Sequence, residues 1–183
     1  MSEIADRYTR LAADFRDTVD DVPSEQWQAA SPCEGWTAHD VVAHVIHAHL
    51  MQLGFLDAAP EAPLPVDEDP LAALDVVVEA VAAALADPDI ASRVIDGVAG
   101  PMTFAESIDG FLSFDLLIHR WDLAQAVGLT AVFDLTDVRW ARGLADDLGE
   151  MLRADGVCGP ARPVPAGADQ QQRLLAHLGR RPE

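Results

Sequence analysis

The sequence predicts an all-α protein, a four-helix bundle with short extra helices and a small hairpin. Apolar residues recur at three- and four-residue steps over several long segments, which is the period of an amphipathic helix. Capping residues precede these segments, and Gly or Pro follows them. The connections have very unequal lengths, and the longest is a Pro-rich acidic stretch over residues 58–69. Helical bundles with crossover loops have this layout.

The first two helices are predicted by their apolar faces. Residues 3–20 place one apolar residue on the same face at every turn. Thr37, followed by Asp40, has the pattern of a capping box and opens a second helix that extends to about Leu56. This second helix is apolar on two adjacent stripes, so we expect it to be buried on two sides, as in a bundle.

The remaining elements follow from breakers and caps. Asp69-Pro70 opens a third helix, with Pro at its first position, and Asp87-Pro88 stops it. Residues 90–102 have β-like content and Gly breakers, which indicate either a short extended segment or a hairpin. Thr103 begins a second capping box and a long helix that ends at Gly128. A fifth helix is expected from residue 134 through Met151 until Gly156, and a last one over residues 170–178.

Length and charge restrict the class of protein. A chain of 183 residues is expected to form one domain, residues 1–183. Its 31 acidic and 12 basic residues give a net charge of −19, which argues against binding to nucleic acid or to an anionic membrane. No apolar run approaches the roughly 18 residues of a membrane span. The acidic start of the chain lacks the layout of a signal peptide, so we expect a cytoplasmic location.

The two cysteines, Cys33 and Cys158, lie far apart in the sequence. Neither belongs to a Cys-x-x-Cys pair, so no redox or zinc-ribbon motif is present. A cytosolic chain keeps its thiols reduced, and two free thiols are therefore the expected state.

Three side chains on two predicted helices are candidate metal ligands. Asp115 and His119 are four residues apart, which places both on one face of the long helix. His44, on the second helix, is the best candidate for a third ligand. Two imidazoles and one carboxylate suit Zn²⁺ first, with Ni²⁺, Fe²⁺ or Mn²⁺ as alternatives. Three protein ligands leave coordination positions open, as in a catalytic site.

Each candidate also has a plainer interpretation. Asp115 can be an exposed or hydrogen-bonded carboxylate, and His44 and His119 can be hydrogen-bonded core histidines. His47 is an alternative fourth ligand, a group that orients a ligand, or a proton shuttle. Asp122, one turn beyond His119, either orients that ring or forms a surface ion pair with Arg120. Cys33 is either a reactive thiol or a small buried residue. The other histidines are expected at the surface: His39, His49 and His177.

Four segments together resemble a known family. They are residues 32–37 (PCEGWT), 40–44 (DVVAH), 115–124 (DLLIHRWDLA) and 172–180 (QRLLAHLGR). They resemble an actinobacterial family of metal-binding proteins in the DinB/YfiT-like superfamily, which is similar to the N-terminal metal-binding domain of mycothiol-dependent maleylpyruvate isomerase. The resemblance spans nearly the whole chain.

The resemblance implies a four-helix bundle that binds a divalent metal through His44, Asp115 and His119. The isomerase has Glu where Asp115 stands, so this carboxylate arm is one methylene shorter. Active members of the superfamily bind the thiol of mycothiol, bacillithiol or glutathione to the metal as a thiolate. The isomerase also carries an additional C-terminal domain that we do not expect here, so maleylpyruvate is not expected to be the substrate.

The first functional prediction is a divalent-metal-dependent enzyme of the transferase or isomerase kind, whose partners are a mycothiol-like low-molecular-weight thiol and a small electrophile. The alternative is a non-catalytic bundle that binds a metal or a small molecule. A third interpretation is purely structural, with the histidines hydrogen-bonded in a dry core. Pairing into a homodimer is left open by the sequence.

Overall fold

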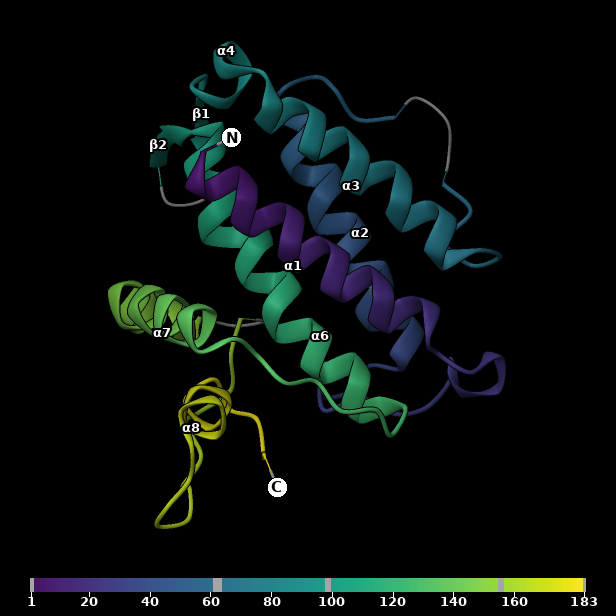
Figure 1. Ribbon diagram of the computed structural model, residues 1–183, viewed down its shortest axis with the longest axis vertical. Coiled ribbons are helices and arrows are strands. Elements are labelled where there is room, and N and C mark those ends of the chain that lie inside the picture. The colour runs from purple at the N-terminus through teal and green to yellow at the C-terminus, as the bar shows by residue number, and fades with distance from the viewer. Residues whose placement is uncertain (1, 61–63, 98–99, 155–156, 183) are drawn as a thin grey trace. The chain divides into compact units, whose positions relative to one another are not determined.

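The structure is a computed structural model that describes residues 2–60, 64–97, 100–154 and 157–182 (Figure 1). Contacts within the chain divide it into two compact units, residues 1–130 and residues 131–183. The candidate metal ligands all lie in the first unit. The assignment of residues 1–183 to a single domain stays a prediction.

The first unit is a four-helix bundle, which confirms the predicted fold class. The four rods are α1 (Glu3–Asp20), α2 (Ala38–Gly54), α3 (Pro70–Ala86) and a compound rod whose last part is α6 (Phe114–Ala126). Helices α1 and α2 each pack against both α3 and α6 (Figure 1). Large side chains on the facing sides fill the centre; Tyr8, Leu11 and Phe15 of α1 are fully buried. Burial of such side chains is the main source of stability in a bundle.

The helix starts are those that the caps predict. Thr37 and Asp40 form a reciprocal capping box at the start of α2, and Thr103 and Glu106 form another at the start of the compound rod. The side chain of Asp69 accepts a hydrogen bond from the backbone of α3, whose first residue is Pro70. These bonds satisfy N–H groups that the first turn of a helix leaves without partners.

The compound rod differs from the single long helix that the sequence predicts. It begins with α5 (Phe104–Ser107), widens into a π turn, η2 (Ile108–Ser113), and continues as α6. A π turn holds one more residue than an α turn. The side chains of α6 therefore point in different directions, relative to those of α5, than they would in one uninterrupted α-helix. The rod ends as predicted beside Gly128, which has φ +72°. The N–H of Leu129 donates to the carbonyl of Ala124, as in a glycine C-cap.

The predicted hairpin is present. Strand β1 (Val94–Gly97) pairs antiparallel with β2 (Gly100–Thr103), and Val94 lies opposite Thr103. Two short helical turns complete the unit, η1 (Ser24–Gln26) and α4 (Pro88–Ala91).

The prediction that His49 lies at the surface is wrong. Its side chain is 0% exposed, and both ring nitrogens are bonded. Nδ1 contacts the carbonyl of Val45 at 2.7 Å, and Nε2 contacts the hydroxyl of Tyr8 at 3.0 Å. The tyrosine comes from α1, 41 residues away, so local periodicity gives no sign of this pair. A buried imidazole is acceptable here because its polar atoms have partners.

The second unit contains α7 (Leu135–Leu148), η3 (Gly149–Arg153) and α8 (Gln170–His177). Helix α7 ends before the predicted Met151 because Gly149, with φ +51°, turns the backbone out of the α conformation. The predicted stop, Gly156, lies outside the described residues. Among the described residues of both units, no helix has the length and apolar content needed to cross a membrane.

Candidate metal centre

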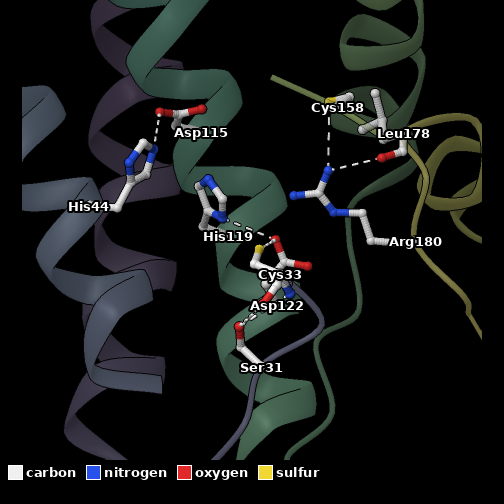
Figure 2. A network of polar contacts seen from close by, with 9 residues as sticks. All are labelled: Ser31, Cys33, His44, Asp115, His119, Asp122, Cys158, Leu178 and Arg180. Carbon is white, nitrogen blue, oxygen red and sulfur yellow. Dashed lines mark hydrogen bonds and ion pairs between the residues drawn. The ribbon is translucent and has the colours of Figure 1, made fainter. Parts of the chain in front are cut away.

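The three predicted ligands converge between α2 and α6. His44 comes from α2, and Asp115 and His119 come from successive turns of α6 (Figure 2). One ligand atom from each of the three lies within 4.8 Å of the other two. Nε2 of His44 is 3.4 Å from Oδ2 of Asp115, and the two imidazole ring centres are 4.9 Å apart. The structure therefore brings His44 next to the pair that the four-residue spacing selects.

The donor set and its separation fit a divalent cation. Nitrogen and oxygen ligands of a tetrahedral Zn²⁺, each at about 2.1 Å, lie about 3.4 Å from one another. The distance from His44 to Asp115 has this value. The side chains of His44 and Asp115 are 36% and 31% exposed, so solvent and small solutes can reach this side of the trio. His119, at the inner side, is buried.

Asp115 is held in its charged form by its neighbours. Burial between the helices favours the neutral acid and by itself raises the pKa of the Asp115 carboxyl. The hydrogen bond from His44 and the nearby charges of His119 and His44 outweigh that effect and hold this pKa below its ordinary value. At neutral pH, Asp115 is thus a carboxylate, the form that binds metal ions.

Asp122 orients the ring of His119. Its Oδ2 is 3.0 Å from Nδ1 of His119, and the Asp122 side chain is 0% exposed (Figure 2). A carboxylate can only accept, so Nδ1 carries the hydrogen and Nε2 keeps the lone pair. In Figure 2, Nε2 is the ring nitrogen turned away from Asp122. Of the two roles open for Asp122, the burial excludes the surface ion pair, and Arg120 instead pairs with Asp14 on α1.

Trp36 covers both imidazoles, a contact that sequence reasoning missed. Its ring centre is 4.9 Å from that of His44 and 6.0 Å from that of His119, and it is stacked on the latter. Trp36 is held by a tight turn in which its N–H donates to the carbonyl of Cys33. Gly35, at the third position of this turn, has φ +79°, a conformation that glycine adopts without strain. Two signals in the sequence pointed to this residue: its position directly before the Thr37 cap, and its place in the segment 32–37 that resembles the family.

Cys33 is the other side chain that this turn presents to the centre. Its Sγ is 3.4 Å from Oδ2 of Asp122, the same oxygen that binds His119 (Figure 2). The backbone N–H of Cys33 donates to the hydroxyl of Ser31, which fixes the residue in place. Neither Cys33 nor Cys158 is in a disulfide, so the expectation of two thiols is confirmed.

The remaining histidines do not join the trio. His47 is exposed on α2, and no potential metal cluster among the described residues includes it. His39 is only partly exposed, with Nε2 3.2 Å from the carbonyl of Val66. His177, in the second unit, is also partly exposed, and burial beside Arg142 and Arg153 lowers its pKa.

The chain is similar in sequence to two curated proteins and to one protein-family model. Two uncharacterized proteins of Mycobacterium tuberculosis, from strains CDC 1551 and H37Rv, are each 29% identical to it over 172 residues. In each case the match covers 91% of both chains. No solved structure matches the chain at a significant level. Residues 8–124 match the family model of the mycothiol maleylpyruvate isomerase N-terminal domain, and this segment includes all three converging side chains. The chain therefore belongs to the mycothiol maleylpyruvate isomerase N-terminal domain family.

Proposed function

We propose that this protein is a divalent-metal-dependent enzyme that uses a low-molecular-weight thiol of the mycothiol type in transferase or isomerase chemistry. His44, Asp115 and His119 hold the cation, and Zn²⁺ is the metal that their donor atoms suit first. The observation that carries the proposal is the convergence of these side chains within a segment that matches a mycothiol-related family.

The protein side of the centre has the features of a reactive site. Among the described residues, three side chains form this group, and two of them are about one third exposed, so a small ligand can approach. A bound divalent cation lowers the pKa of a coordinated thiol and so supplies a nucleophile at neutral pH. The charged Asp115 offsets part of the positive charge at the centre. Asp122 keeps the lone pair of His119 on Nε2.

Trp36 sets one wall of the approach. Its indole lies against both imidazoles and restricts the angles at which those rings can turn. An aromatic face beside the ligands also gives an apolar surface on which the carbon skeleton of an electrophile can rest. The turn over residues 33–36, closed by the hydrogen bond from the Trp36 N–H to the Cys33 carbonyl, fixes that wall to the start of α2.

The test is transfer of mycothiol to a small model electrophile by the purified protein, with and without a chelator. We expect turnover that the chelator abolishes and that added Zn²⁺ restores. His44→Ala should remove this turnover and weaken Zn²⁺ binding by more than the roughly 10- to 100-fold that loss of an outer partner produces. Its matched control is His47→Ala, an exposed histidine three residues further along the same helix.

Two outcomes would contradict the proposal. Turnover that does not change with the chelator would exclude a metal-dependent step. A protein that binds Zn²⁺ through His44 but transfers no thiol to any of several electrophiles would be a binding protein, not an enzyme. Thermal stabilisation by metal does not separate these cases, because binding stabilises the folded state in both.

A further inference from the structure

We infer that Cys33, His119 and Asp122 form a second cation site that competes with the first one for His119. One ligand atom from each of these three residues lies within 4.8 Å of the other two. Sγ of Cys33 is 3.4 Å from Oδ2 of Asp122, and Nδ1 of His119 is 3.0 Å from the same oxygen. Figure 2 shows Cys33 and Asp122 on the side of His119 away from His44 and Asp115. The inference does not depend on the proposed enzymatic activity.

Two of the three ligand separations are close to those around a bound ion. Around a tetrahedral Zn²⁺ with Zn–S about 2.3 Å, a sulfur and an oxygen ligand lie about 3.6 Å apart. Nitrogen and oxygen ligands lie about 3.4 Å apart. Cys33 and Asp122 are within a few tenths of an ångström of the first value, and His119 and Asp122 have to separate slightly to reach the second.

The site is built into the protein interior and still accessible. The side chains of Asp122 and His119 are 0% and 10% exposed, respectively, so their positions are fixed by packing. Cys33 is partly exposed on its turn, which gives an ion a way in from solvent. A carboxylate with no exposed surface supplies the negative charge that attracts a cation.

Its chemistry differs from that of the first site. Sulfur, nitrogen and oxygen donors favour thiophilic ions such as Zn²⁺, Cd²⁺ and Co²⁺ over Mg²⁺ or Mn²⁺. On binding, the Cys33 thiol loses its proton to solvent and a metal–sulfur bond forms, with no change of oxidation state. The His44 site offers no sulfur from the protein and therefore has a different optical signature.

The two sites compete because both use the single imidazole ring of His119. A neutral imidazole has one lone pair, on Nε2 or on Nδ1, according to which nitrogen carries the hydrogen. An ion held with His44 and Asp115 uses Nε2, and an ion held with Cys33 uses Nδ1. The two sites therefore need opposite tautomers of one ring. An ion that leaves the first site has a sulfur-containing site within the same cluster.

The test is a titration of the His44→Ala variant with Co²⁺ under anaerobic conditions. This variant loses a ligand of the first site and keeps all three of the second. We expect one Co²⁺ per chain and a thiolate-to-cobalt charge-transfer band in the near ultraviolet, with one proton released per ion. Adding Cys33→Ser to this variant should abolish the band and weaken Co²⁺ binding at least about tenfold. Zn²⁺ should bleach the band when it displaces Co²⁺.

The other thiol provides the matched control. Cys158→Ser in the same His44→Ala background should leave the band unchanged. If His44→Ala does not fold, as judged by circular dichroism, Asp115→Ala removes a different ligand of the first site and takes its place. A folded variant that shows no band at saturating Co²⁺ would overturn the inference. So would a band that persists after Cys33→Ser.

Discussion

The buried pair of His49 and Tyr8 makes stability depend on pH in a way that can be calculated. Burial lowers the pKa of His49 from 6.5 to about 4, although its hydrogen bond to Val45 and the charge of Asp115 partly oppose this. Burial also raises the pKa of Tyr8, so the tyrosine stays neutral over the whole range. Between pH 6.5 and pH 4, His49 is therefore protonated in the unfolded chain but stays neutral in the folded chain.

The free energy of unfolding should accordingly fall as the pH drops from about 6.5 to about 4. Above this range His49 is neutral in both states and has no effect. With these pKa values, the loss attributable to His49 is about 2 kcal/mol at pH 5 and approaches about 3 kcal/mol below pH 4. That is a large share of the 5 to 15 kcal/mol that stabilises a typical domain.

Urea denaturation of the metal-free protein at pH 7 and pH 5 measures this loss. Carboxylates also titrate in this range, so the useful quantity is a difference between variants. The His49→Gln variant, which cannot titrate at this position, should lose about 2 kcal/mol less than the wild type between the two pH values. His47→Gln, two residues away and exposed, should behave as the wild type. Equal losses in the wild type and His49→Gln would refute the reasoning.

Three further substitutions test other parts of the bundle. Asp122→Asn should weaken Zn²⁺ binding roughly 10- to 100-fold, measured by chelator competition, because the amide no longer fixes the tautomer of His119; an unchanged affinity would contradict this. Ser113→Ala should stabilise the protein by about 1 kcal/mol in urea, since the buried Ser113 hydroxyl has no hydrogen-bond partner among the described residues; a destabilised variant would reveal a partner. Gly35→Ala should destabilise by about 1 to 2 kcal/mol through its positive φ and alter Trp36 fluorescence; Gly54→Ala is the control.

Local signals explain why most of the fold could be predicted. A capping box involves two residues three positions apart. The starts of the helices after Thr37 and Thr103 can therefore be predicted from a few neighbouring residues alone. The spacing of Asp115 and His119 is equally local, because one helix fixes it. Adding His44 required only that two apolar helices of a bundle lie side by side.

The features that were missed depend on distant contacts. His49 is buried because Tyr8, 41 residues earlier, bonds its ring. Cys33 meets Asp122 across 89 residues, and no spacing in the sequence connects them. The π turn is absent from the prediction because a period of 3.6 residues does not distinguish it from an ordinary helix; in the structure this turn packs against α1 and α2.

That extra residue has a consequence for how the rod can change over evolution. Each residue of an α-helix advances the side-chain direction by about 100°, so a rod without the π turn would present its two halves with a different relative rotation. Losing one residue anywhere within Ile108–Ser113 would swing the carboxylate and imidazole of α6 around the rod axis while leaving the hairpin end seated. A single codon therefore separates a chain whose ligands face His44 from one whose ligands face elsewhere.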